Sequence, residues 1–299
     1  MGRGRSAEAS RSRDDFRRGS QELEVATSGQ CPRGAGSVIF QAAITHWRNV
    51  APWPQDSQVE QDLILCRALV EIFQDSVAVG RLLLRGGTAL HKLFVASPQR
   101  YSEDIDLVQV AAGPIGPLLN AIRARLDPIL GTPRRERSQG NVTLRYRVES
   151  EIPPVVPLRL KVEINTREHF AVSDPLGRPF AVRSPWFEGQ AEVRTYALEE
   201  LLATKLRALY QRRKGRDLFD LWLGLNIKGA DPERIVKIFR AYMKAEGHKI
   251  GRSLFEKNLA DKIALRQFND DLNPLLAPTA RYDAGKAARL VSQELLARL

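Results

Sequence analysis

The chain has 299 residues, of which 43% are hydrophobic and 27% charged, and its formal net charge is +11 at pH 7. This is the composition of a globular protein, and no apolar run is long enough to cross a bilayer. The basic excess favours a polyanionic partner such as RNA, DNA or nucleotide phosphates. The two cysteines and four histidines are scattered, which excludes a disulfide framework and a zinc site and predicts a cytoplasmic protein.

The first 36 residues differ from the rest of the chain in composition and in hydrophobic pattern. They are rich in Gly, Ser and Arg and have little apolar periodicity, which predicts a disordered leader. They lack the apolar segment of a secretory signal, and their acidic residues argue against an organellar transit peptide.

From Val38 onward, apolar periodicity predicts a mixture of helices and strands. The expected helices cover residues 38–47, 59–77, 88–94, 115–130, 198–210, 217–225, 232–245 and 282–299. The expected strands cover residues 81–85, 104–110, 142–148 and 158–165, and an irregular stretch with Pro175, Pro179 and Pro185 follows. The order predicts an α+β fold, with a small mixed sheet flanked by helices over residues 37–195 and a helical domain over residues 196–299.

A glycine pair, Gly86-Gly87, follows the first expected strand, and Thr88 is placed to cap the helix after it. A glycine turn lets a phosphate approach backbone N–H groups, and a helix N-terminus favours negative charge. Glycine pairs also occur in ordinary tight turns, so the pair alone identifies no site.

Two aspartates, Asp104 and Asp106, lie on the next expected strand with Ile105 between them. Residues two apart in a strand point to the same face, so the carboxylates project together while Ile105 faces the core. At about 6.5 Å apart they repel each other unless a cation lies between them. Mg²⁺ commonly binds one or two carboxylates together with substrate phosphates. The pair therefore predicts a metal clamp for phosphoryl or nucleotidyl transfer, and the alternative is the solvent face of an ordinary strand.

The segment LKVEIN, Leu160–Asn165, alternates so that Lys161, Glu163 and Asn165 share one face. If this strand lies beside the aspartate pair, Glu163 becomes a third carboxylate. It would then act as a metal ligand or as a general base for an attacking hydroxyl. The alternative is a half-exposed strand whose charges face solvent.

A charged helical segment, TKLRALYQRRKGRDLFDLW, runs from Thr204 to Trp222. Lys205 and Arg212 are seven residues apart, so they share a helix face. Asp217 and Asp220 share a face of the following helix. Cations near a metal would hold a nucleoside triphosphate and offset developing charge. The alternative is a solvated helix with a charged turn.

Together these motifs resemble a known family. Gly86-Gly87, a helix, and the segment Ser102–Leu107 resemble the signature of DNA polymerase β-like nucleotidyltransferases. More narrowly, RGGTALHKLF, YSEDIDLV, KVEINTR and RDLFDLW are similar to AbiEii/AbiGii-type toxins, a group that includes the MenT mycobacterial toxins. The resemblance covers residues 47–225. The gap between Gly87 and Asp104 is longer than in the shortest polymerase β-like motifs.

The resemblance implies a nucleotidyltransferase core with its metal site on the sheet surface. It implies Mg²⁺ (or Mn²⁺) and transfer of a nucleotide from an NTP to an acceptor, which in some members is the 3′ end of tRNA. It also implies an antitoxin protein, usually encoded nearby. The metal residues matched are Asp104 and Asp106, with Glu163 where an Asp is common. The catalytic residues are these three together with Lys205 and Asp220. Asp217 is an alternative to Asp220. The nucleotide-binding set is Gly86, Gly87, Thr88, Ser102, Lys205 and Arg212.

Two other functions stay open. The same fold would serve a phosphotransferase that modifies a partner or itself, with Ser102 as an acceptor beside the metal. A basic RNA- or nucleotide-binding module without activity is the third reading. The acidic residues argue against it, because binding a polyanion needs no carboxylates that face it.

Overall fold

A computed structural model describes residues 39–299, so the predicted disordered leader, residues 1–36, lies outside the described residues. The helices are α1 (Gln41–Trp47), α2 (Asp56–Gln74), α3 (Ser76–Val79), α4 (Gly86–Leu93), α5 (Gly116–Leu130), α6 (Leu198–Gln211), α7 (Gly215–Leu225), α8 (Pro232–Ala245), α9 (Arg252–Ile263), α10 (Arg266–Asp270) and α11 (Ala284–Glu294), with short 3₁₀ turns η1 (Asn273–Leu275) and η2 (Leu296–Arg298). The strands are β1 (Leu82–Arg85), β2 (Asp104–Gln109), β3 (Arg134–Ser138), β4 (Asn141–Glu149), β5 (Pro157–Asn165), β6 (Leu176–Arg183) and β7 (Glu188–Thr195).

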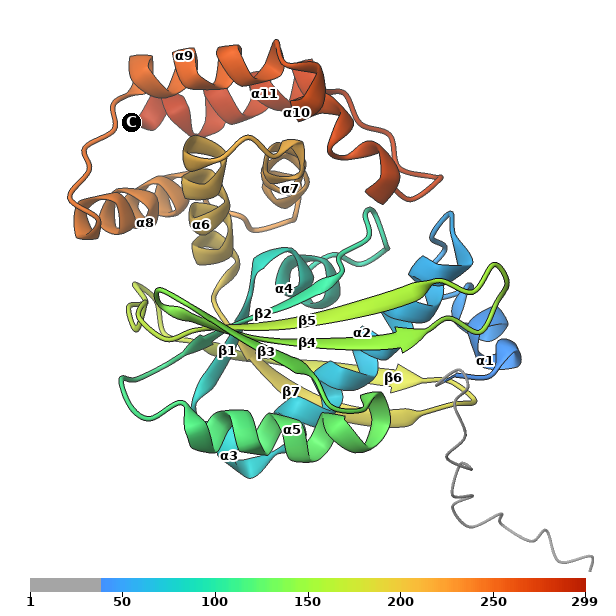
Figure 1. Ribbon diagram of the computed structural model, residues 1–299. Helices are drawn as coiled ribbons and strands as arrows, with labels where there is room; N and C mark the ends of the chain where they lie inside the picture. The colour runs from blue at the N-terminus through green and yellow to red at the C-terminus, as the bar shows by residue number, and fades with distance from the viewer. Residues whose placement is uncertain (1–38) are drawn as a thin grey trace, which may run out of the picture. The chain divides into compact units, whose positions relative to one another are not determined.

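The strands form one mixed sheet in the order β3-β4-β5-β2-β1-β7-β6 (Figure 1). β2 pairs antiparallel with β1 and parallel with β5, although α5, β3 and β4 intervene in the chain between β2 and β5. Figure 1 shows α4 and α5 on opposite sides of this sheet. The predicted α+β class, a mixed sheet flanked by helices, is confirmed.

The buried apolar side chains fall into two clusters. The first joins the sheet to α1, α2 and α5, and the second is built mainly from α6 to α11. Leu90 of α4 is fully buried and belongs to the second cluster, so α4 lies against both the strands and the C-terminal helices. The predicted domain boundary at residues 195 and 196 stays a prediction. Within residues 39–299, no helix has the length and hydropathy needed to span a membrane.

The structure corrects the expected elements at both sheet edges. The stretch expected to be irregular forms the hairpin of β6 and β7, in which Pro179 lies opposite Glu192. Proline is tolerated there because β6 is an edge strand and needs no second partner. At the other edge, β3 was not expected, because its residues RRERS are polar on both faces and carry no apolar alternation.

Candidate active site

The predicted carboxylates meet on one face of the sheet. Asp104 and Asp106 are partly exposed in β2, whereas Ile105 between them is fully buried. The parallel pairing with β5 sets Asp104 opposite Lys161 and Asp106 opposite Glu163. Residues directly opposite each other in neighbouring strands share a face, so Glu163 lies beside the aspartate pair as the alternation suggested.

Lys161 contributes a charge that the sequence did not assign. Its Nζ atom lies 3.1 Å from Oδ2 of Asp104 and 3.5 Å from Oε2 of Glu163. Burial would lower the pKa of Lys161, but the three carboxylates outweigh burial and raise it. Burial raises the pKa of Asp104 above its usual value, although Lys161 opposes this shift. The single positive charge of the ammonium group is therefore shared between two of the clustered carboxylates and offsets part of their repulsion.

The glycine turn approaches Asp106 closely. Gly86 has φ +77°, and a Cβ atom built on it would lie 2.5 Å from Oδ2 of Asp106. A Cβ on Gly87 would lie 2.4 Å from a guanidinium nitrogen of Arg100 and 3.1 Å from Oγ of Ser102. Both glycines are needed for the start of α4, with its unpaired N–H groups, to lie this close to β2.

Gly86→Ala is expected to lower any activity that depends on Asp106 by about a hundredfold, because the added methyl group displaces the carboxylate. Gly131→Ala is the matched control, since Gly131 has φ +76° and no atom within 4 Å of its Cβ position. Each variant loses about 1–3 kcal/mol through a positive φ, and urea unfolding measures this cost in both. Equal activity in the two variants would contradict the close approach to Asp106.

Thr88 is not the helix cap that the sequence suggested. The helix begins two residues earlier, at Gly86, and has no side-chain cap. The Thr88 hydroxyl instead donates to the backbone carbonyl of Asp104 and lies 2.9 Å from Oγ of Ser102. These contacts connect α4 to the start of β2 and hold Ser102 beside the aspartates.

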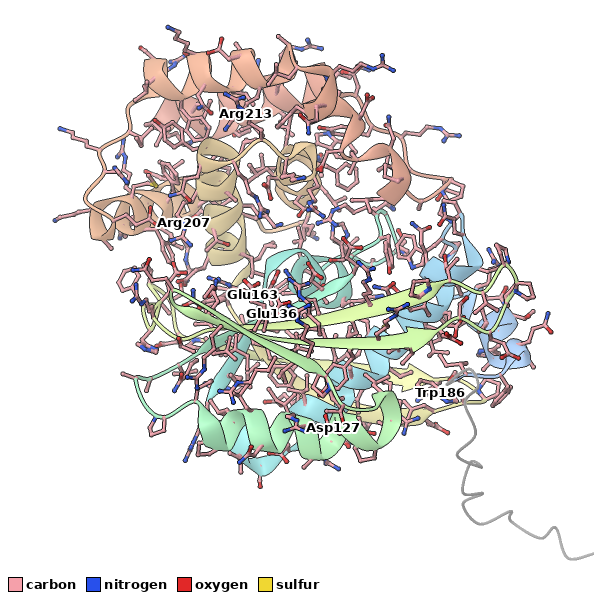
Figure 2. The ribbon with its side chains drawn as sticks, viewed as in Figure 1. Asp127, Glu136, Glu163, Trp186, Arg207 and Arg213 are labelled. Carbon is pink, nitrogen blue, oxygen red and sulfur yellow. The ribbon has the colours of Figure 1, made fainter. Side chains whose placement is uncertain are left out.

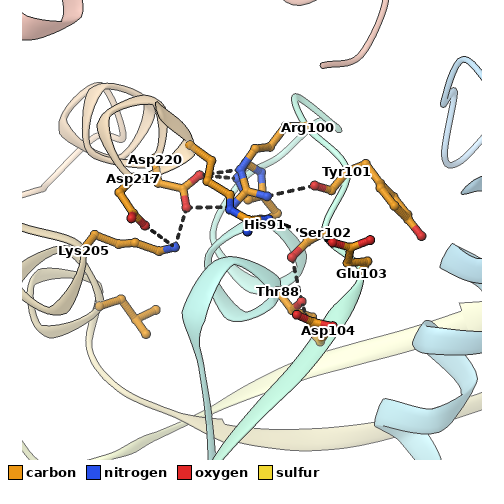
Figure 3. A network of polar contacts seen from close by, with 12 residues as sticks. Thr88, His91, Arg100, Tyr101, Ser102, Glu103, Asp104, Lys205, Asp217 and Asp220 are labelled. Atoms are coloured by element: carbon orange, nitrogen blue, oxygen red, sulfur yellow. Dashed lines mark hydrogen bonds and ion pairs between the residues drawn. The ribbon is translucent and has the colours of Figure 1, made fainter. Parts of the chain in front are cut away.

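Asp220 lies at the centre of a separate, buried charge network (Figure 3). Its Oδ1 accepts from Nε of Arg100 at 2.7 Å and from Nε2 of His91 at 2.9 Å. Its Oδ2 lies 2.7 Å from both a second Arg100 nitrogen and Nζ of Lys205. Burial would raise the pKa of Asp220, but Arg100 and Lys205 hold it well below its ordinary value. Burial and the Arg100 charge lower the pKa of His91 to about 4, so its neutral imidazole donates to Asp220.

Arg212 extends this network to a half-exposed guanidinium group. It donates two hydrogen bonds, of 2.7 and 2.8 Å, to Asp217, which also lies 3.4 Å from Lys205. The bond with Asp217 raises the pKa of Arg212, and the charge of Asp106 adds to this shift. The half-exposed guanidinium of Arg212 therefore lies within the field of the carboxylate cluster.

The structure thus divides the predicted residues into two groups. Asp104, Asp106 and Glu163 come together on the sheet with Gly86 of α4 against Asp106, whereas Lys205 and Asp220 belong to the buried network. Both competing aspartates, Asp217 and Asp220, contact Lys205. The sequence motifs gave no role to Lys161, His91 or Arg100. Arg100 lies 120 residues from Asp220 in the chain, so no local spacing could have indicated this pair.

The carboxylate pair suits a hard divalent cation. Asp104 and Asp106 supply oxygen ligands from one face, and Mg²⁺ often binds only one or two carboxylates together with substrate phosphates. Within residues 39–299, no three Asp, Glu, His or Cys side chains are grouped closely enough to hold a metal ion. Since Glu163 contacts Lys161, its place among the metal ligands stays a prediction.

The chain is similar to one described family and to several solved structures. The model of a family described as nucleotidyl transferase AbiEii toxin, type IV TA system, matches residues 67–288, more than half of the chain. MenT4, a nucleotidyltransferase toxin from Mycobacterium tuberculosis, is 16% identical with a TM-score of 0.61, over 87% of this chain and 90% of that one. JHP933 from Helicobacter pylori is 20% identical with a TM-score of 0.49, over 80% and 91%. At such identities MenT4 shows the fold alone. Among curated proteins, none matches this chain.

Proposed function

This chain belongs to the AbiEii family of nucleotidyltransferase toxins, and from that membership we propose that it transfers a nucleoside monophosphate from an NTP to the 3′ end of tRNA. The observation that carries the proposal is the pairing of β2 with β5, which sets Asp104, Asp106 and Glu163 on one face. A module that only binds RNA gains nothing from three carboxylates that repel phosphate.

The residues divide the work of the reaction. The acceptor hydroxyl oxygen forms a bond to the α-phosphorus, and the bond from that phosphorus to the oxygen bridging to the β-phosphate breaks, so pyrophosphate leaves. Glu163, beside the aspartates, takes the hydroxyl proton. Asp104 and Asp106 would hold Mg²⁺, which would supply positive charge to stabilise the phosphoryl oxygens. The N–H groups at the start of α4 and the guanidinium of Arg212 bind the triphosphate.

Lys205 and Asp220 act from the buried network. Asp220 is fully buried behind Arg100 and Lys205, so it orients these cations and does not itself contact the nucleotide. The ammonium group of Lys205 is buried against Asp217 and Asp220, so it adds its positive charge to triphosphate binding from within the network. Asp217 holds Arg212 in the same way.

The test uses purified protein, total tRNA, Mg²⁺ and each α-³²P-labelled NTP in turn, with Asp104→Ala as the control. We expect the wild type to label tRNA, and we expect no label with Asp104→Ala or in the presence of EDTA. The NTP that gives the label identifies the transferred nucleotide. Label on protein from a γ-labelled NTP would replace the proposal with phosphotransfer. RNA binding that survives EDTA without consumption of any NTP would replace it with a binding module.

The proposal includes a protein partner and a place of action. Membership of a type IV toxin–antitoxin family implies a cognate antitoxin, which we expect to suppress transfer when it is added. Since the acceptor and the NTPs are cytoplasmic, the reaction takes place in the cytoplasm.

A further inference from the structure

The sheet face that carries the carboxylates continues from β2 to the edge strand β3. The pairing register aligns Asp104 with Lys161, Lys161 with Arg145, and Arg145 with Arg134. Because directly paired residues share a face, one row of side chains contains a carboxylate, a lysine and two arginines. The exposed fraction of the cationic side chains falls from 82% at Arg134 to 48% at Arg145 and 23% at Lys161. The row therefore leads from open solvent to Asp104.

A second cationic row lies beside the first. Arg159 of β5 is paired with Arg147 of β4, and both are exposed. Along the strands they lie two residues, or about 6.6 Å, from Lys161 and Arg145. In the part of the chain from residue 39 to 299, neither guanidinium has a hydrogen bond or an ion pair.

The pair of Arg147 and Arg159 is unfavourable for the fold itself. Like charges directly opposite each other on neighbouring strands destabilise a sheet, and carboxylates offset this for Arg145 and Lys161 but not for Arg147 and Arg159. Nothing in the packing of β4 and β5 needs these cations, because their opposite faces hold the buried core residues. An anionic ligand that spans the two rows would remove the repulsion.

The same face also carries acidic residues, so its charge is not uniform. The cations on β3, β4 and β5 are Arg134, Arg145, Arg147, Arg159 and Lys161, and the carboxylates are Glu136, Glu149 and Glu163. Figure 2 shows Glu136 and Glu163 on the side of the sheet away from Asp127 of α5. The Glu136 carboxylate lies 2.8 Å from Nε of Arg145, and the Glu163 carboxylate contacts Lys161. Arg147 and Arg159 are the cations of β4 and β5 that remain available to bind an anion.

We propose that the cationic face, defined as Arg134, Arg145, Arg147 and Arg159, binds the backbone phosphates of the acceptor RNA next to its 3′ end. The inference rests on the proposed function, because it supplies the path by which the acceptor hydroxyl reaches Glu163 and Asp104. These strands present no aromatic side chain on this face for bases to stack on. Binding therefore follows the phosphates and not the base sequence.

The experiment compares two double variants that lose the same charge. Arg147→Ala/Arg159→Ala removes the unpaired cations of the face. Arg135→Ala/Arg137→Ala is the matched control, because these exposed residues of β3 alternate onto the opposite face. Affinity for fluorescently labelled total tRNA is measured by anisotropy across a salt series, without NTP or metal. Steady-state transfer then gives KM for RNA, KM for NTP and kcat.

The Arg147→Ala/Arg159→Ala protein should bind tRNA roughly tenfold more weakly, with a salt slope reduced by about two, because two phosphate contacts disappear. Its KM for RNA should rise by a similar factor while kcat and KM for NTP stay unchanged, and its melting temperature should not fall. The control should match the wild type. Equal tRNA affinity and equal salt slope in both double variants would overturn the proposal. An acidic protein would then be the next candidate ligand for the cationic face. If only Arg147→Ala/Arg159→Ala weakens the salt-dependent binding of tRNA, the result supports the cationic face, even if the wild type transfers no nucleotide. The proposal of RNA binding and the proposal of nucleotidyl transfer can therefore fail independently.

Discussion

Asp106→Asn is expected to lower kcat/KM for nucleotidyl transfer by about a thousandfold or more. A bound metal contributes several kcal/mol of charge stabilisation, and each 1.4 kcal/mol is a factor of ten in rate. Asparagine keeps the shape of the side chain beside Gly86 but loses the charge that attracts a divalent cation. The free energy of unfolding should stay within about 1 kcal/mol of the wild type, because the substitution also relieves repulsion with Asp104.

The matched control for Asp106→Asn is Glu103→Gln, a neighbouring carboxylate with an exposed side chain and one long contact to Arg216. It should retain wild-type activity. Steady-state kinetics on all three proteins, with urea unfolding alongside, separates loss of chemistry from loss of fold. Retention of a tenth or more of the activity by Asp106→Asn would exclude this aspartate from the reaction centre.

The sequence predicted well those features that depend on local alternation. The period of two in DIDL and KVEI placed Asp106 and Glu163 on the polar faces of their strands, and the structure agrees. The sequence could not decide that β5 lies next to β2, because α5 and two strands separate them in the chain. The third carboxylate depended on that pairing, and so did the contact of Lys161 with Asp104.

Other features carried no local signal. β3 and β6 are edge strands with mostly exposed side chains, so the apolar pattern that reveals inner strands is missing from them. The partners of Asp220 come from α4, the loop before β2 and α6, which only the tertiary fold brings together. The resemblance placed Asp220 in the catalytic set, which stays a prediction, and the contacts of Asp220 in the structure are those of a buried counter-ion.

Asp220→Asn is accordingly expected to lower the free energy of unfolding by about 3–5 kcal/mol, the usual cost of removing one partner from a buried ion pair. The substitution leaves Arg100 and Lys205 buried without their shared carboxylate. Urea unfolding measures the loss. The control is Asp271→Asn, whose partners Lys214 and Arg216 are both partly exposed to solvent, and it should cost less than about 1 kcal/mol.

The effect of Asp220 should depend on pH with a defined sign. The folded pKa of Asp220 lies well below that of the unfolded chain, so its contribution is complete above about pH 4 and declines as the pH falls toward the folded value. The stability difference between wild type and Asp220→Asn should therefore narrow in acid. A difference that stayed constant from pH 7 to pH 3 would exclude the ionised carboxylate as its source.

Measurements of transfer activity distinguish a positioning role of Asp220 from a direct catalytic role. Under conditions in which the variant is folded, we expect transfer to fall about 10- to 100-fold, as for residues that orient groups in contact with the substrate. Arg100→Gln should lower activity by a similar factor, and the double variant by no more than the larger single loss, because both act through one network. A thousandfold loss with unchanged stability would instead place Asp220 among the reacting groups, together with Asp106.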